Sequence, residues 1–188
     1  MRLLVLHGSP RKTGWGVRFL EEAIAGYKEV HPEAEVVEVH LNDLHLRGCQ
    51  HCMACKSAVH DVPCCVLEDD IQKVLHTMLE SDAVLWGVPN YMGNYNGQVK
   101  ILLDRFYGFM APEGRTRLPL AQKTGIILNQ GNPDETMYAS VETSMSGLLS
   151  ARDQRFVAVT TIGNCRGEAD LATDEMLQRA RSIGTQIA

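Results

Sequence analysis

The sequence predicts an α/β fold in which a sheet of five parallel strands lies between two layers of helices. Short apolar and β-branched runs alternate along the chain with longer segments of helical period, and this alternation favours a parallel sheet covered on both faces. The 188 residues have the length of one domain, and no repeat or Pro/Gly/Ser-rich linker divides them. Hydrophobic residues make up 45% of the chain, which suffices for one core. We therefore expect a single domain over residues 1–188.

Five runs have the length and composition of strands, namely residues 3–6, 35–39, 83–88, 124–128 and 156–161. The first run ends at the turn sequence Gly8-Ser9-Pro10. The third run, Ala-Val-Leu-Trp-Gly-Val, is apolar throughout, and we expect it to be buried on both faces. Its Trp86 is therefore assigned to the core.

The segments between these runs carry apolar residues three and four positions apart, which is the spacing of an amphipathic helix. The expected buried faces are, in order, Val17, Leu20, Ile24 and Tyr27; Ile71, Val74, Leu75 and Met78; Val99, Leu102, Leu103 and Phe106; Met137, Val141 and Leu148; and Leu171, Leu177, Ala180 and Ile187. The second helix begins at Asp69-Asp70, because carboxylates at a helix N-terminus meet its positive end. A cysteine-rich loop, residues 45–67, separates the second strand from this helix.

Charge and hydropathy exclude several classes of protein. The chain has 18 Lys and Arg against 23 Asp and Glu, a formal net charge of −5, and its basic residues are scattered, so we expect no nucleic-acid partner. The apolar run at the N-terminus is shorter than the core of a signal peptide, and no run approaches the roughly 18–20 apolar residues of a membrane span. We expect a cytoplasmic protein with no membrane partner, in a compartment that keeps thiols reduced.

Parallel sheets bind ligands beyond the carboxyl ends of their strands, where the strand order reverses. The loop after the first strand, residues 8–16, joins it to a helix N-terminus, which favours a phosphate. Its glycines allow a tight turn, Ser9 and Thr13 offer hydroxyls, and Arg11 and Lys12 add charge. The loop lacks the motifs of ATP and dinucleotide sites, so it indicates a cradle for a single phosphate. The alternative is an ordinary turn with a solvated Arg-Lys pair.

The loops after the third and fourth strands have the composition of a site for a planar ring. In the first of them, residues 89–100, Tyr91 is suited to stack on such a ring. In the second, residues 129–133, amide side chains and a glycine backbone suit the polar edge of the ring. The alternatives are that Tyr91 and Tyr95 anchor a loop, and that an Asn-Pro turn needs no ligand.

Three motifs together resemble the NAD(P)H-dependent FMN reductase family, and within it the iron–sulfur flavoproteins are the most similar branch. They are Gly-Ser-Pro-Arg-x-x-Gly after the first strand, Pro-x-Tyr-x-Gly-x-x-x-Gly-x-x-Lys-x-x-x-Asp-Arg from Pro89 to Arg105, and Cys-x-x-Cys-x-x-Cys before Asp69-Asp70-Ile71. The resemblance implies a flavodoxin-like three-layer sandwich with strand order 2-1-3-4-5. It also implies bound FMN and a homodimer or homotetramer.

The resemblance carries over to particular positions of this chain. The residues that it places around the FMN phosphate are Ser9, Arg11, Lys12, Thr13, Gly14, Trp15 and Gly16. The residues that it places along the isoalloxazine ring and its edge are Pro89, Asn90, Tyr91, Met92, Gly93, Asn94, Gln130 and Gly131. FMN supplies the redox chemistry, so no side chain is expected to act as a catalytic acid or base.

Five of the six cysteines lie between Cys49 and Cys65, which in a reducing compartment favours metal binding or redox chemistry over a disulfide scaffold. Three of them form the compact Cys-x-x-Cys-x-x-Cys set of ferredoxin-like sites. Cys64 and Cys65 are candidates for the fourth ligand, and Cys65 stands at the family's offset before the Asp-Asp pair. The ligands that we expect for a [4Fe–4S] cluster are Cys49, Cys52, Cys55 and Cys65.

Other interpretations of these cysteines stay open. The thiolates with His51 or His60 are a candidate zinc site. A Cys-x-x-Cys pair is a candidate redox disulfide beside the flavin, and a third alternative is a set of reduced, empty thiols. Cys165 lies apart from the others and is assigned a structural role.

Two functions of different class follow. The first is an FMN-dependent oxidoreductase that takes electrons from NAD(P)H and reduces flavins, quinones or similar acceptors. The alternative is an iron–sulfur flavoprotein that takes electrons from ferredoxin and passes them through the cluster to FMN. A flavin-free zinc protein on the same fold is a third hypothesis, which a colourless preparation with stoichiometric zinc would reveal.

Overall fold

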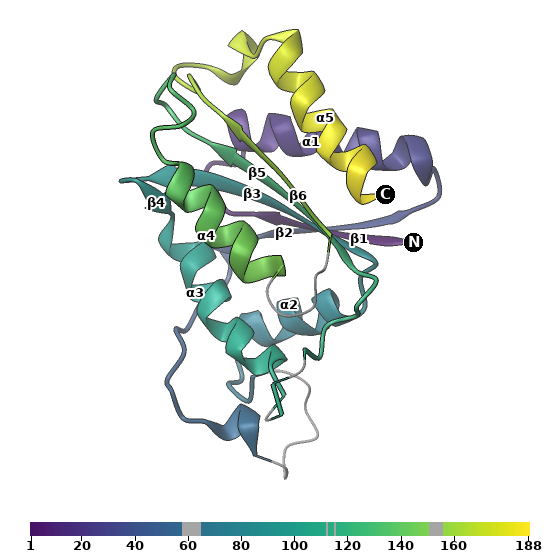
Figure 1. Cartoon of the computed structure of the whole chain (residues 1–188), viewed down its shortest axis with the longest axis vertical. Coiled ribbons are helices and arrows are strands. Elements are labelled where there is room, and N and C mark those ends of the chain that lie inside the picture. The colour runs from purple at the N-terminus through teal and green to yellow at the C-terminus, as the bar shows by residue number, and fades with distance from the viewer. Residues whose placement is uncertain (58–64, 112, 115, 151–155) are drawn as a thin grey trace.

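A computed structural model describes residues 1–57, 65–111, 113–114, 116–150 and 156–188, and it has one central sheet between two layers of helices (Figure 1). The parallel strands are β1 (Arg2–His7), β2 (Glu35–His40), β3 (Ala83–Tyr91), β5 (Lys123–Asn129) and β6 (Val157–Ile162). Their order is β2-β1-β3-β5-β6, so the five expected strands occur in the expected order.

A sixth strand, β4 (Asn94–Tyr95), was not expected. It runs antiparallel to the end of β3, pairing Asn94 with Tyr91 and Tyr95 with Asn90. The two residues of the turn, Met92 and Gly93, have φ angles of 53° and 75°, which is typical of a two-residue hairpin turn. The loop after the third strand therefore folds back on the sheet as a hairpin.

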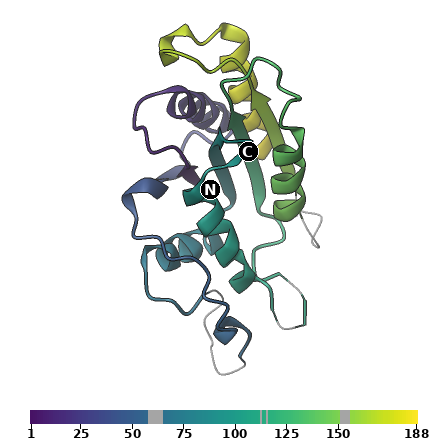
Figure 2. The same cartoon turned by 90° about the vertical axis from the view of Figure 1, so that its left-hand side faces the viewer.

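The helices form two layers, one on each face of the sheet (Figure 2). One layer consists of α1 (Trp15–Val30) and α5 (Asp174–Ile187), and the other of α2 (Asp70–Leu79), α3 (Gly97–Arg105) and α4 (Ala139–Ser150). Single 3₁₀ turns are η1 (Leu41–Asp43), η2 (Ala54–Lys56), η3 (Phe106–Phe109) and η4 (Ala169–Leu171). Along β1, Leu3 and Val5 face the first layer while Leu4 and Leu6 face the second, because successive strand side chains alternate.

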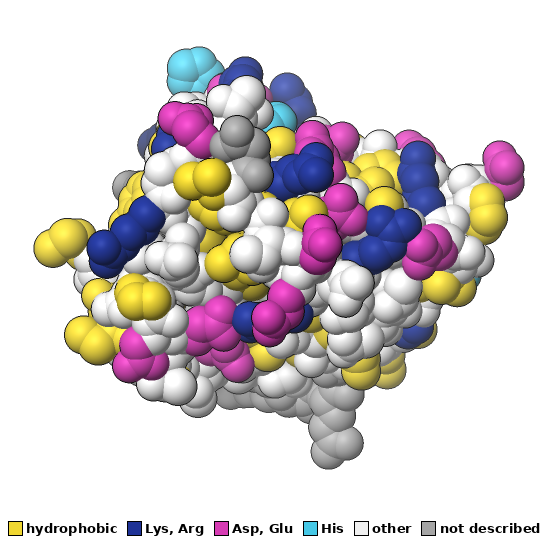
Figure 3. Space-filling view, turned by 90° about the horizontal axis from the view of Figure 1, so that it is seen from above, with side chains coloured by type: hydrophobic (Ala, Val, Ile, Leu, Met, Phe, Trp, Pro, Cys, Tyr) yellow, Lys and Arg dark blue, Asp and Glu magenta, His cyan; other side chains and the backbone are white. Residues whose placement is uncertain are grey.

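The two helices of the first layer cross in backbone contact. A Cβ atom on Gly184 would lie 1.8 Å from the carbonyl oxygen of Ala23, so α5 can approach α1 this closely only with glycine there. At the rim of the crossing, Arg181 forms ion pairs with Glu22 and Glu29 at 2.9 and 2.6 Å. Seen from above, acidic and basic side chains are interspersed over this face (Figure 3).

The expected buried faces of the last two helices were wrong in part. Met137 precedes α4 and is 57% exposed, and Leu148 is exposed as well. The buried residues of α4 are Val141, Met145 and Leu149, because intervals of four keep these on one side of a helix that begins at Ala139. Five other residues expected in buried faces also differ: Leu171 is exposed in η4, and the half-buried ones are Val17, Ile24, Phe106 and Leu177.

The assignment of Trp86 to the core is confirmed, since its side chain is buried against the α2–α4 layer. Within the described ranges, no helix combines the length and the apolar character that a bilayer crossing requires.

Candidate functional site

Four loops meet at the carboxyl ends of the parallel strands and enclose a cleft of about 100 Å³. They follow β1, β3, β5 and β6, so the three expected loops do come together and a fourth joins them. The residues that line the cleft are Ser9, Arg11, Gly14, Trp15, Gly16, Pro89, Asn90, Tyr91, Asn129, Gln130, Gly131 and Cys165.

The remaining expected residues lie beside this cleft. Lys12 and Thr13 line a wider hollow of about 450 Å³ between the first loop and α5. Met92 is fully exposed at the tip of the β3–β4 hairpin, and Gly93 lies against the ring of Tyr138. Asn94 is exposed in β4.

The N-terminus of α1 has the properties of an anion site. No side chain caps it, and its first turn carries no acidic residue, whereas Asp69 caps α2 and Thr173 caps α5. Its first backbone N–H groups therefore point out of the helix without a side-chain acceptor. The preceding Gly14 has φ 144° and ψ −176°, a conformation that essentially only glycine adopts. Arg11 places its guanidinium beside this glycine. Together these groups suit a phosphate.

The first loop is held against β3 and α3. The N–H of Gly8 donates to the carbonyl oxygen of Gly87 at 2.8 Å, and a Cβ on Gly8 would lie 2.6 Å from that oxygen. Asn96, the buried residue before α3, donates from Nδ2 to the Gly8 carbonyl at 2.6 Å. Asn96 thus fixes the first loop instead of capping its own helix.

One buried polar atom in the cleft wall fits a bound cofactor. The Oδ1 atom of Asn129 is buried and has no hydrogen-bond partner in the described part of the chain. It lies 3.4 Å from where a Cβ on Gly16 would be, so it faces the start of α1. A buried acceptor without a donor is costly unless a ligand satisfies it. A ligand hydroxyl that lies between a phosphate and a ring would donate the missing hydrogen bond to Asn129.

The loop after β6 is the part of the site that the sequence analysis missed. Trp15 donates from Nε1 to the carbonyl of Gly167 at 3.2 Å, which joins this loop to α1. The N–H of Cys165 donates to the carbonyl of Gln130 at 2.9 Å, and Nε of Arg166 donates to that of Gly131 at 2.5 Å. The loops after β5 and β6 therefore form one wall. The signal available in the sequence was position, because this loop also follows a parallel strand.

Cys165 lies in this wall as a neutral thiol. It is partly buried, and its Sγ donates to the carbonyls of Ile162 and Gly163 at 3.4 and 3.5 Å. Burial raises the pKa of Cys165 to about 12. A thiol with this pKa is a poor nucleophile near neutral pH.

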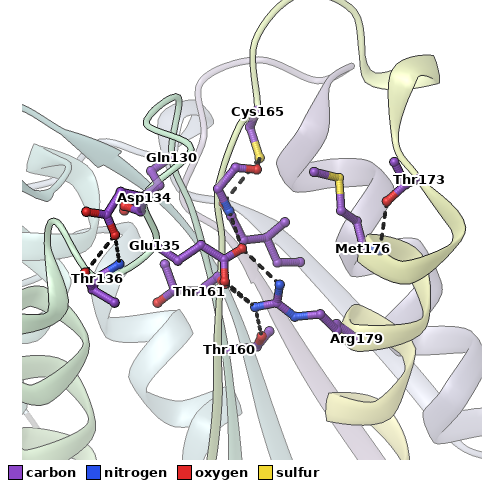
Figure 4. Close-up of polar contacts among 12 residues, drawn as sticks. Gln130, Asp134, Glu135, Thr136, Thr160, Thr161, Cys165, Thr173, Met176 and Arg179 are labelled. Carbon is purple, nitrogen blue, oxygen red and sulfur yellow. Dashed lines mark hydrogen bonds and ion pairs between the residues drawn. The ribbon is translucent and has the colours of Figure 1, made fainter.

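An ion pair between Glu135 and Arg179 joins the loop after β5 to α5 (Figure 4). Glu135, after β5, accepts two hydrogen bonds of 2.9 Å from Arg179 of α5, and a third of 2.8 Å from the N–H of Gly163. Arg179 also donates to the Thr160 hydroxyl at 3.2 Å. The hydrogen bonds from Arg179 hold the pKa of Glu135 below its ordinary value. Gln130 is buried and donates to the Asp134 carbonyl at 2.7 Å.

The cysteine loop forms a second candidate site. Cys49 and Cys52 are exposed, Cys55 is half-buried and Cys65 is buried, and all of the cysteines that the structure describes are free thiols. Burial raises the pKa of the Cys55 thiol, and the charges of the other three cysteines raise it further. Cys49, Cys52 and Cys65 therefore each lie within electrostatic range of Cys55. Cys64 and His60 lie outside the described residues.

The described cysteines do not form a site for a single metal ion. Among the described residues, no three His, Cys, Asp or Glu side chains converge closely enough to hold one metal ion. Zinc draws its ligands to about 2.0–2.3 Å from one centre. In a [4Fe–4S] cluster each thiolate binds a different iron, so the four sulfurs stand farther apart.

The described part of the cysteine loop lies at the C-terminal end of α3, beside η3 (Figure 1). Lys56 donates to the carbonyls of Tyr107 and Met110, and its ammonium lies 3.9 Å from the centroid of the Tyr107 ring. Arg117 donates to the Cys55 carbonyl at 3.2 Å. The nine residues of α3, a length of about 14 Å, separate the two candidate sites.

Comparison with known proteins finds relatives that match most of the chain. The model of a family described as NADPH-dependent FMN reductase matches residues 1–163. An "Iron-sulfur flavoprotein" of Archaeoglobus fulgidus is 42% identical over 165 residues, covering 87% of this chain and 75% of its own length. Another, of Methanocaldococcus jannaschii, is 32% identical over 196 residues and covers 100% and 96%.

Solved structures share the fold at low sequence identity. An NAD(P)H:quinone oxidoreductase from Methanothermobacter marburgensis superposes with a TM-score of 0.77 at 17% identity, covering 100% of this chain and 99% of that one. An azoreductase from Bacillus anthracis has a TM-score of 0.72 at 19% identity, with 99% of each chain covered. At these identities the likeness shows the flavodoxin-like fold alone.

Proposed function

The chain belongs to the NADPH-dependent FMN reductase family and is an FMN-dependent oxidoreductase, and we propose that its FMN binds in the cleft at the carboxyl ends of β1, β3 and β5. The observation that carries this proposal is the uncapped N-terminus of α1, which opens on the cleft between the loops. An uncapped helix N-terminus with a neighbouring arginine is a site for a phosphate group.

Each part of the cofactor has a counterpart in the cleft. The first turn of α1 and Arg11 would bind the phosphate, and Oδ1 of Asn129 would accept a hydrogen bond from a ribityl hydroxyl. Tyr91, which is 46% exposed, would cover the ring, and the backbone of Gln130 and Gly131 would meet its polar edge. FMN, when bound, supplies hydride and single-electron chemistry. The protein positions the ring and leaves one side open to the donor.

We propose NAD(P)H as the electron donor, with flavins, quinones or similar planar molecules as acceptors. The exposed hairpin tip at Met92 and the adjacent Tyr91 offer an apolar surface beside the ring position. Planar aromatic molecules stack on such surfaces.

A second candidate function is supported by the cysteines. We propose that Cys49, Cys52, Cys55 and Cys65 bind a [4Fe–4S] cluster that receives single electrons from ferredoxin. Two observations favour this function: Cys49, Cys52 and Cys65 lie within electrostatic range of Cys55, and the relatives of this chain in Archaeoglobus and Methanocaldococcus are named iron–sulfur flavoproteins.

An anaerobic spectrum, with iron and sulfide assayed on the same sample, separates these functions. Flavin absorption with about four irons per chain supports the cluster, whereas flavin without iron leaves the oxidoreductase alone. Bleaching of the flavin by NADPH supports the reductase, and bleaching by reduced ferredoxin only supports the carrier. A colourless chain that takes up no FMN would refute both.

The phosphate site has its own test in Gly14→Ala. Alanine is strained at φ 144°, by about 1–3 kcal/mol, so we expect the Kd for FMN to rise by about tenfold or more. The matched control is Gly147→Ala, because nothing lies within 4 Å of a Cβ at this position of α4. Equal FMN affinity in both variants would contradict the assignment.

A further inference from the structure

A fully buried arginine lies at the base of the cysteine loop. Arg105 is the last residue of α3, and its side chain is 0% exposed. Its partner, the carboxylate of Asp69, is 3% exposed and accepts hydrogen bonds of 2.7 and 3.1 Å from the two terminal nitrogens. Burying an ion pair costs desolvation free energy, so a pair this deep gives little stability by itself. A role in shaping the cysteine loop would account for the burial of this ion pair.

The pair holds the two ends of the cysteine loop together. Nη1 of Arg105 donates to the carbonyl of Arg47 at 2.9 Å, and Nη2 donates to that of Leu67 at 3.4 Å. These two carbonyls flank the segment that carries all four expected ligands. Asp69 also accepts the N–H of Arg47 at 3.3 Å and that of Gln72 at 3.3 Å, which ties the loop to the start of α2. One guanidinium and one carboxylate thus join α3, α2 and both ends of the loop.

Arg105 also lies next to a candidate ligand. Cys65 is 8% exposed. Burial by itself lowers the pKa of Arg105, but the hydrogen bond to Asp69, together with the proximity of Cys65 and a hydrogen bond to it, outweighs burial and raises this pKa. Nε of Arg105 is buried and has no hydrogen-bond partner among the residues that the structure describes. A buried donor of this kind calls for an acceptor. A metal-bound thiolate or a cluster sulfide is an acceptor that would fit.

We propose that Arg105 and Asp69 are positioning residues that hold the cysteine loop in its cluster-binding shape, and that Arg105 places its positive charge and a free N–H beside the Cys65 thiolate. This inference rests on the proposed ligation of a [4Fe–4S] cluster by the four cysteines. Hydrogen bonds and charge next to ligand sulfurs tune such clusters, and residues that orient ligands are typically worth about 10- to 100-fold in metal affinity.

Two variants separate shape from charge. Arg105→Lys keeps the charge but loses the planar fork that reaches both carbonyls and the carboxylate. The double variant Arg105→Gln with Asp69→Asn removes both charges. A single substitution would leave one buried charge unpaired and would destabilise the fold, and the double variant avoids this. The control is Lys100→Gln, on the same helix, which removes an exposed charge paired only with Asp104.

The measurements are made on full-length chains reconstituted anaerobically with iron and sulfide. We expect iron to pass to a chelator at least about tenfold faster from both Arg105 variants than from the wild-type chain. The reduction potential of the remaining cluster should stay close to wild type in Arg105→Lys, which keeps the charge, and should shift in the double variant, which removes both the charge pair and the hydrogen-bond donors beside Cys65. FMN content and helical circular dichroism should stay unchanged, and Lys100→Gln should match the wild type throughout.

The proposal is overturned if the double variant keeps its iron and its potential, or if FMN content and helicity fall together with iron, since that would show a purely structural role. A wild-type chain that takes up FMN but no iron would refute the cluster itself, and this inference with it. The two failures are distinct, because only the second is visible in the wild-type chain.

Discussion

Replacing Gly184 by alanine tests how closely α5 must approach α1. The added Cβ would lie 1.8 Å from the carbonyl oxygen of Ala23, and 2.8 Å from the N–H nitrogen of Tyr27. Both are backbone atoms, so no side-chain rotation relieves the contact. The helices would have to separate by more than about 1 Å, and side chains that pack across such a gap lose a quarter to a half of their dispersion attraction.

The expected cost follows from two opposing effects. Alanine inside a helix is favoured over glycine by about 1 kcal/mol. Overpacking a core costs about 1–3 kcal/mol, and more where backbone must move. Since Ala23, Tyr27 and Ile183 are all buried at this crossing, we expect a net loss of about 2 kcal/mol or more in the free energy of unfolding.

Guanidinium chloride unfolding, followed by circular dichroism, measures this loss. Gly147→Ala is the matched control, because it gains the same helix propensity and meets nothing within 4 Å, so it should be neutral or more stable by about 0.5–1 kcal/mol. If Gly184→Ala were as stable as Gly147→Ala, the backbone contact between α1 and α5 would be refuted.

Two further predictions concern Trp15 and His7. Trp15→Phe removes the hydrogen bond from Nε1 to the Gly167 carbonyl. We expect this change to lower the free energy of unfolding by about 1 kcal/mol and to weaken FMN binding, which a fluorescence titration would measure. Unchanged FMN affinity would contradict the role of the fourth loop. His7 is buried at the end of β1, and its Nε2 lies 2.8 Å from Glu38. Burial lowers the pKa of His7, so the folded chain favours the neutral imidazole. The contribution of neutral His7 to the free energy of unfolding is complete above about pH 6.5 and is lost as the pH falls through the lowered pKa. Unfolding between pH 7 and 5 should therefore be less pH-dependent in His7→Gln than in the wild type, and equal slopes would contradict this.

Local pattern was enough to predict the layers of the fold. Runs such as residues 83–88 are apolar because both faces of the central strand are covered, and helical spacing marked the face of α2 correctly. Where only part of a helix face is apolar, as in α4, the pattern placed Leu148 inside instead of Leu149. A weak period does not determine the first residue of a helix, and one residue of error turns the face by about 100°.

The sequence by itself determined the positions of the strands, three of the four loops that meet at the cleft, and the cysteine-rich segment, because these depend on residues close together in the chain; the strand order followed from the resemblance to the FMN reductase family. The tertiary structure alone decided the rest. Arg105 reaches Arg47 and Asp69, which are 58 and 36 positions away, and Trp15 reaches Gly167 across 152 positions. Such contacts join segments with no common period or motif, so their energies depend on distances that exist only once the chain has folded.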